Sequence, residues 1–202
     1  MAEIQYAAPE TVAAAVKALA AGKGRAKVLA GGTDLLVQLR AGRISPDVIV
    51  DIKKIPELRK VKKDKGGFRV GAAVSGQELG ENADFRADWP GVLEGFELIG
   101  STQVQGRASL GGNLCNGSPA ADGVPGLIAA GATVTIAGPK GEREENVEDV
   151  VTGPGQTSLK AGEFVVSINL PKRGKRGGDA YLRFIPRTEM DIAVVGAAVS
   201  LT

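Results

Sequence analysis

The sequence of 202 residues contains no histidine. A Ser-His-Asp triad, a histidine-ligated zinc ion and a histidine general base are therefore excluded within this chain. Its single cysteine, Cys115, forbids an internal disulfide and supplies only one of the roughly four thiolates that an iron–sulfur cluster needs. Any redox chemistry of this chain consequently needs an organic cofactor, and any metal belongs to a partner.

Charge and hydrophobicity exclude further classes of protein. The formal net charge is only +2, which favours neither a nucleic acid nor an anionic membrane as partner. No apolar run reaches the roughly 18 residues that span a bilayer, and the first ten residues lack the basic and apolar regions of a Sec signal. With one cysteine, the sequence fits a reducing compartment, so we predict a cytoplasmic protein without a membrane span.

The most informative stretch covers residues 109–122, with the sequence SLGGNLCNGSPAAD. Gly111 and Gly112 have no Cβ atom, so a ligand can come close to the backbone, and consecutive N–H groups in a turn form an anion-binding nest. Asp122 precedes an apolar run and is a candidate N-cap for a following helix. These residues alone leave two interpretations open: a phosphate-binding turn, or a tight loop that caps a helix and binds nothing.

A second glycine-rich stretch, KVLAGGTDLLVQL, covers residues 27–39. A short buried strand is predicted at 28–30, followed by a turn at Gly31 and Gly32. Thr33 or Asp34 is expected to cap a helix that presents three leucines at helical spacing. Two such segments, about eighty residues apart, could face each other across one long ligand with a diphosphate in its middle.

Hydrophobic patterns predict mixed α and β structure in the rest of the chain. A βαβα order in residues 4–52 indicates strands that are at least partly parallel. Ser75 and Glu78 resemble a capping box, and the basic stretches 58–65 and 171–179 are expected on the solvent-exposed surface. Trp89 and Cys115 are interpreted as packing residues. Further strands are predicted at 4–6, 48–52, 68–72, 133–136, 163–170 and 180–185, with a last buried strand at 192–201.

The segments AGGTDLL and SLGGNLCNGSPAAD resemble the two signature loops of the FAD-binding medium subunit of molybdenum hydroxylases, the family of xanthine, carbon monoxide and aldehyde dehydrogenases. The resemblance covers nearly the whole chain. It implies an α+β, two-subdomain FAD-binding fold of the vanillyl-alcohol oxidase (PCMH) type, with the C-terminal family domain missing or only begun. The expected parts are 1–55 (N-terminal FAD-binding subdomain), 56–178 (second subdomain) and 179–202 (return strand and start of a truncated domain).

The resemblance also implies which residues contact FAD. One side of the cofactor would be bound by the stretch from Val28 to Leu35, with two further residues near the flavin and a second glycine segment opposite. Val165 would meet the adenine, and Arg183 stands where family members often have lysine, which is a departure because the two are not interchangeable. The implied cofactor-binding residues are Val28, Leu29, Ala30, Gly31, Gly32, Thr33, Asp34, Leu35, Ile99, Gly100, Ser109, Gly111, Gly112, Asn113, Asn116, Ser118, Asp122, Val165 and Arg183.

By the same resemblance the chain is an oxidoreductase subunit with no catalytic or metal-binding side chain of its own. FAD, held non-covalently, would relay electrons from [2Fe–2S] clusters of a small partner subunit to an external acceptor. A large subunit would carry the molybdenum cofactor and oxidise the substrate, and the assembly would be a dimer of heterotrimers. The alternative is a non-catalytic assembly module that keeps the fold and has lost flavin binding.

Two other nucleotide-binding classes lack their motifs. A Rossmann domain needs G-x-G-x-x-G after its first strand, and AGGTDLL does not have that spacing. A P-loop needs G-x-x-x-x-G-K-[ST], which is absent from the sequence.

Overall fold

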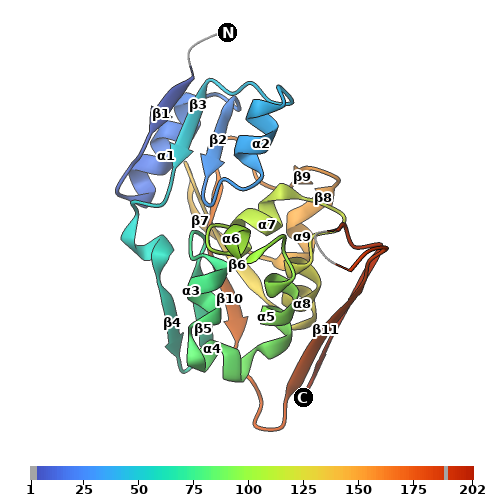
Figure 1. Cartoon of the computed structure of the whole chain (residues 1–202). Helices are drawn as coiled ribbons and strands as arrows, with labels where there is room; N and C mark the ends of the chain where they lie inside the picture. Colours follow the sequence, from blue (N-terminus) through green and yellow to red (C-terminus); the bar gives the residue numbers. More distant parts are fainter. Residues whose placement is uncertain (1–3, 189–190) are drawn as a thin grey trace.

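The computed structural model of the chain describes residues 4–188 and 191–202. The N-terminal part is a three-stranded, fully parallel sheet in the order β1-β3-β2, with α1 and α2 connecting its strands (Figure 1). The predicted βαβα order and its parallel strands are therefore confirmed. The elements are β1 (Gln5–Ala7), α1 (Val12–Ala21), β2 (Ala26–Leu29), α2 (Leu35–Arg40) and β3 (Val48–Asp51).

The following part of the chain forms an antiparallel five-stranded sheet in the order β4-β5-β10-β6-β7. Most of its helices come in one run between β5 and β6. The capping box of Ser75 and Glu78 at the start of α3 is present as predicted. The elements are η1 (Pro56–Arg59), β4 (Val61–Asp64), β5 (Gly67–Gly71), α3 (Gly76–Gly80), α4 (Ala83–Asp88), α5 (Pro90–Glu97), α6 (Thr102–Gln105), α7 (Leu110–Asn116), α8 (Gly123–Ala129), β6 (Thr133–Gly138), β7 (Gly141–Asn146), α9 (Val147–Val150), β8 (Val151–Gly153), β9 (Gln156–Thr157) and β10 (Phe164–Pro171).

Strand β10 contributes to both apolar clusters of the molecule. Val165 and Ile168 pack into the larger cluster, which contains the buried residues of α5, α7 and α8. Phe164 and Val166 pack into the smaller cluster, with Ala15 of α1. Because successive strand residues point to opposite faces, one strand serves both clusters, and an irregularity between Val165 and Ser167 shifts the alternation. Strand β10 of the five-stranded sheet thereby packs against the N-terminal part through its side chains in the smaller cluster.

The chain continues into an antiparallel hairpin of β11 (Gly178–Phe184) and β12 (Val195–Leu201), drawn in red in Figure 1. Its first strand lies against α5, where a Cβ atom on Gly91 would be only 2.5 Å from the backbone nitrogen of Ala180. The prediction of a buried last strand is wrong, because β12 pairs only with β11 and leaves much of its apolar surface uncovered. The exposed apolar residues of this segment are Ile192, Val194, Val195, Val199 and Leu201.

Two residues in the stretches predicted on the surface are buried: Leu58, which is 0% exposed and packs in the smaller apolar cluster, and Arg173. The Arg173 side chain, in the basic stretch after β10, is only 10% exposed and forms an ion pair with Asp179 at 2.6 Å. Its guanidinium group lies 4.6 Å from the centre of the Trp89 ring, which is itself buried. A cation over an indole face is favourable enough to hold an arginine inside. The packing role predicted for Trp89 is confirmed, and the expectation that the whole basic stretch is exposed is wrong. In the part of the chain described, no helix is long and apolar enough to cross a bilayer.

Candidate functional site

A cavity of about 660 Å³ lies where the two glycine segments meet. Three stretches of chain line it: the β2–α2 region, residues between Ile99 and Asn116, and the connection from Gly155 to Val165. In Figure 1 the first two lie one above the other, with α7 below the β2–α2 connection. The volume is in the range of small-molecule and cofactor sites.

The first glycine segment touches Arg107 and Ala108, immediately before the second segment. A Cβ atom on Gly31 would lie 2.0 Å from the carbonyl oxygen of Arg107, so only glycine allows this approach. The Arg107 side chain donates a hydrogen bond from Nε to the Gly31 carbonyl at 3.2 Å. Gly32 follows with a φ of +79°, a left-handed conformation that glycine adopts without strain. These contacts fix the turn predicted at Gly31 and Gly32.

The second glycine pair is not a turn, contrary to the prediction from the sequence. Gly111 and Gly112 lie in the first turn of α7, and neither has a positive φ. The helix begins there because the Ser109 hydroxyl accepts a hydrogen bond from the Gly112 N–H at 3.1 Å, as an N-cap does. Gly111 packs against Ala72, the residue that follows β5, where its Cβ atom would come within 2.8 Å of the carbonyl oxygen. The nest of backbone N–H groups is therefore replaced by a helix N-terminus.

Two residues of α7, Gly112 and Asn113, line the cavity next to the helix start. A Cβ atom on Gly112 would meet only the Ser109 hydroxyl, at 3.2 Å, so the missing side chain leaves open space. The Oδ1 atom of Asn113 is buried and accepts no hydrogen bond. This atom would lie 2.7 Å from a Cβ atom on Gly123 of α8, which does not line the cavity, so the oxygen points into the packing between α7 and α8.

The carbonyl oxygen of Ala30 accepts a hydrogen bond from a cluster of polar side chains at the end of β3. Lys53 donates from Nζ to this carbonyl at 3.0 Å and to Asp51 at 2.8 Å. Tyr6 donates its hydroxyl to the same carboxylate at 2.7 Å. Burial opposes the ionisation of Asp51, but the hydrogen bonds from Lys53 and Tyr6 prevail and lower its pKa. Asp51 thus helps to fix the first glycine segment, a role that the sequence pattern did not indicate.

Most of the predicted site residues are brought together in the cavity, and five are not part of its lining. The residues that line it are Val28, Ala30, Gly31, Gly32, Thr33, Asp34, Leu35, Ile99, Ser109, Gly111, Gly112, Asn113, Asn116 and Val165. The others are Leu29, Gly100, Ser118, Asp122 and Arg183. Asp34 stands at the N-cap position of α2, but its side chain does not cap the helix and instead accepts a hydrogen bond from Gln38.

Asp122 and Arg183 are bonded to each other. Arg183 donates from Nη1 to Asp122 at 2.9 Å, and Tyr181 donates its hydroxyl to the same carboxylate at 2.7 Å. Burial and the adjacent carboxylate raise the pKa of Tyr181. Asp122 occupies the N-cap position of α8, but its side chain makes no capping hydrogen bond there. Arg183 also donates to the carbonyl of Leu98 at 3.0 Å, which links this cluster to the neighbouring Ile99 of the cavity.

Cys115 also lines the cavity. Burial raises the pKa of its thiol to about 12, so it is protonated at neutral pH. This fits the small hydrophobic residue predicted from the sequence. Among residues 4–188 and 191–202 there is no group of three or more cysteine, aspartate, glutamate or histidine side chains arranged to hold a metal ion.

A second hollow, of about 510 Å³, lies on the open face of the five-stranded sheet. Polar side chains that bond to each other line it: Arg69 donates to Thr135 at 3.2 Å, and Asn169 donates to Thr135 at 3.0 Å. None of the residues predicted to bind a cofactor is in this groove. The cavity between the glycine segments is therefore the candidate site.

Comparison with known proteins identifies similar chains. The family described as the FAD binding domain in molybdopterin dehydrogenase matches residues 2–173. The xanthine dehydrogenase FAD-binding subunit of Escherichia coli O157:H7 is 33% identical over 195 residues, covering 96% of this chain and 66% of the relative. The carbon monoxide dehydrogenase medium chain of Hydrogenophaga pseudoflava is 32% identical, and the match covers 96% of this chain and 68% of the relative. The chain thus spans about two thirds of the length of these relatives.

Solved structures are also similar. A carbon monoxide dehydrogenase from Hydrogenophaga pseudoflava superposes with a TM-score of 0.93 at 31% identity, covering 98% of this chain and 69% of the other. Quinoline 2-oxidoreductase from Pseudomonas putida 86 superposes with a TM-score of 0.91 at 27% identity. The match covers 99% of this chain and 69% of the other.

Proposed function

The chain belongs to the FAD-binding domain family of molybdopterin dehydrogenases, the family that its glycine segments resemble, and on this premise we propose how it works. It is the flavoprotein subunit of a molybdenum-containing dehydrogenase and holds FAD non-covalently in the 660 Å³ cavity. The finer fold assignment belongs to the same proposal: a vanillyl-alcohol oxidase type of FAD fold, divided at residues 1–55, 56–178 and 179–202.

The single observation that carries the proposal is the meeting of both glycine segments at one cavity. Gly31 and Gly32 form a turn on one side, and Gly112 leaves the backbone of α7 open on the other. Backbone N–H groups at a helix start carry a partial positive charge, which suits the diphosphate of a dinucleotide. The cavity therefore offers what a diphosphate needs: close backbone approach and no acidic cluster.

The protein's own residues would bind and orient the cofactor. The first glycine segment would contact the diphosphate and the ribityl chain, and the open backbone of α7 at Gly112 would approach the cofactor from the other side. Bound FAD would supply electron transfer in one-electron or two-electron steps. Asp122 and Arg183 would act through their contact with Leu98, by holding the neighbouring Ile99 near the flavin. The sequence has no histidine for a histidyl–flavin bond, which supports non-covalent binding.

The proposed partners follow from what the relatives are called. One similar chain is called a medium chain of carbon monoxide dehydrogenase, and one similar structure is described as lacking the Mo-pyranopterin moiety of the molybdenum cofactor. We infer a large subunit that holds this cofactor and oxidises the substrate, and a small subunit with [2Fe–2S] clusters, assembled as a cytoplasmic dimer of heterotrimers. Electrons would pass from the clusters through FAD to an external acceptor.

Two experiments test this function. The purified chain is titrated with FAD and then precipitated with acid: we expect a bound flavin spectrum, with all flavin released into the supernatant. The chain is also purified from its native source and analysed for metals and co-purifying subunits. Absence of flavin binding with excess FAD would favour the assembly-module alternative. A lone, metal-free chain that oxidises an aldehyde or heterocycle unaided would contradict the relay.

A further inference from the structure

The middle of the third stretch that lines the cavity, between β9 and β10, has no helix or strand. Residues 158–163 connect β9 to β10, and all of them except Ser158 line the cavity. Within this segment the Glu163 N–H donates to the Lys160 carbonyl at 2.9 Å, and the Ser158 N–H donates to the carbonyl of Val150 at 2.8 Å. Two backbone bonds are few for six residues, so side chains must hold the rest of this wall.

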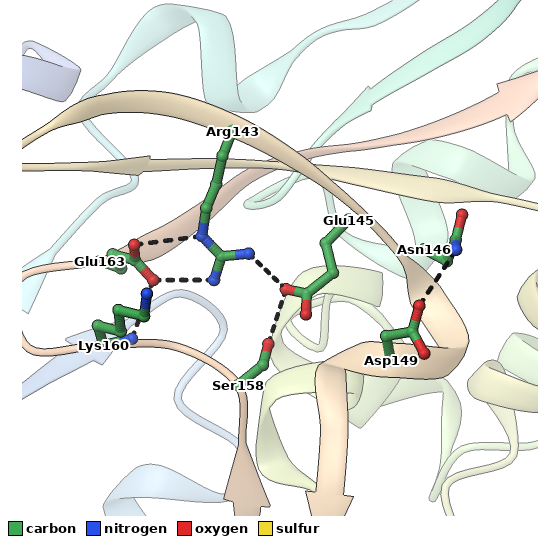
Figure 2. A network of polar contacts seen from close by, with 7 residues as sticks. All are labelled: Arg143, Glu145, Asn146, Asp149, Ser158, Lys160 and Glu163. Carbon is green, nitrogen blue, oxygen red and sulfur yellow. Dashed lines mark hydrogen bonds and ion pairs between the residues drawn. The ribbon is translucent and has the colours of Figure 1, made fainter.

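Arg143 of strand β7 ties both ends of this segment (Figure 2). Its Nε and Nη2 donate to the two carboxylate oxygens of Glu163, at 3.2 and 2.9 Å. Its Nη1 donates to Glu145 at 2.7 Å, and the same carboxylate oxygen of Glu145 accepts from the Ser158 hydroxyl at 2.7 Å. Glu163 also accepts from the Lys160 N–H at 2.9 Å. One guanidinium group thereby restrains the beginning, middle and end of the wall.

The positions of these residues on the sheet make the network specific. Arg143 and Glu145 are two residues apart on β7, so their side chains share one face. Gly138 at the adjoining turn leaves room for Glu163, because a Cβ atom there would lie 2.7 Å from its Cγ. The hydrogen bonds from Arg143 lower the pKa of Glu163, and the two carboxylates raise that of Arg143. The network requires the planar guanidinium group of arginine, because the ammonium group of lysine cannot donate the same set of hydrogen bonds to both carboxylates.

We propose that Arg143 is a positioning residue: through Glu163 and Ser158 it fixes segment 158–163 as a wall of the cavity and thereby sets the affinity for the cofactor. The inference rests on the proposed binding of FAD. A wall held in one conformation loses less conformational entropy when a ligand binds. Without Arg143 the segment samples more conformations, and the cofactor must order it.

The test compares Arg143→Met with Arg86→Met in the full chain. Arg86 is a matched control, because it also pairs with a glutamate, Glu97 at 2.6 Å, and neither residue lines the cavity. We expect Arg143→Met to raise the dissociation constant of FAD about tenfold or more, since charge-assisted hydrogen bonds are lost, and Arg86→Met to change it less than about twofold.

Two milder variants keep the test valid if Arg143→Met folds poorly. Arg143→Lys keeps the charge and is expected to recover only part of the affinity. Ser158→Ala removes one hydrogen bond and no charge, and is expected to weaken binding about threefold. The double variant Arg143→Met with Glu163→Gln should bind no more weakly than the first substitution alone, because both release the same segment.

A measurement on the FAD-free protein separates the two claims. Backbone hydrogen exchange in residues 157–163 should be faster in Arg143→Met than in the wild type, and unchanged in Arg86→Met. If the wild type binds FAD but neither exchange nor affinity responds to Arg143→Met, the positioning role is refuted and the proposed function stands. If exchange responds but the wild type binds no FAD, the proposed function fails, and with it the link from Arg143 to the cofactor.

Discussion

The two glycine pairs look alike in sequence, yet their members do different things in the structure. In each pair the first glycine serves packing: Gly31 lies against the Arg107 carbonyl and Gly111 against the Ala72 carbonyl. The second glycines differ from each other. Gly32 is needed for its φ of +79°, whereas Gly112 is helical and borders open space in the cavity. Gly112 differs from the other three glycines, because neither its backbone conformation nor the packing of the core requires a residue without a side chain.

The largest effect is expected from Gly31→Val. Its Cβ atom would lie 2.0 Å from the carbonyl oxygen of Arg107, so the contact that joins the first glycine segment to the residues just before the second must open. We expect the free energy of unfolding to fall by about 3 kcal/mol or more, measured by urea denaturation. A variant as stable as the wild type would show that this contact does not hold the two segments together.

Gly32→Ala should have a smaller effect. An alanine with a left-handed φ costs about 1–2 kcal/mol, and the new methyl group would press on Leu29 at 2.9 Å. Gly42→Ala is the control, because Gly42 also has a positive φ, of +66°, with nothing near its Cβ position and no place in the cavity lining. We expect both variants to lose stability in denaturation, but only Gly32→Ala to lose FAD affinity. Equal affinity in the two variants would remove the first segment from the binding site.

Gly112→Val should change the free energy of unfolding by less than about 1 kcal/mol, because the position is exposed and a helix accepts valine. The added side chain would nevertheless fill the space in which the backbone meets the cofactor. We expect loss of flavin with retention of the far-ultraviolet circular dichroism spectrum, and a milder loss in Gly112→Ala. Full FAD occupancy in the valine variant would show that α7 does not contact the cofactor.

The smallest effect concerns Cys115. Because burial raises its thiol pKa to about 12, the reactive thiolate is scarce at pH 8 and becomes abundant only as the pH approaches that value. We expect slow alkylation by iodoacetamide at pH 8, and slower alkylation with FAD present, since the residue lines the cavity. Alkylation as fast as that of a small free thiol would contradict the burial of this side chain.

The contrast between the glycine pairs also explains which features of the structure could be predicted from the sequence. Local signals were sufficient for the parallel βαβα order, for the capping box at Ser75 and for the turn at Gly31, because each depends on neighbouring residues. The double glycine at 111 failed as a turn prediction because its conformation is decided by the Ser109 cap and by packing on Ala72, which is distant in sequence.

Partners remote in sequence account for the remaining differences. Asp122 bonds to Tyr181 and Arg183, 59 and 61 residues away, and Lys53 reaches a carbonyl 23 residues away. No local pattern indicates such pairs. The strand from Ile192 was predicted as buried because its composition is apolar, but composition does not tell which faces of a strand the rest of the fold covers.

The most direct test of the account is a crystal structure of the chain with FAD. We predict that the diphosphate lies between the turn at Gly32 and the first turn of α7 at Gly112. FAD bound instead in the groove on the open face of the five-stranded sheet, beside Arg69 and Asn169, would contradict it.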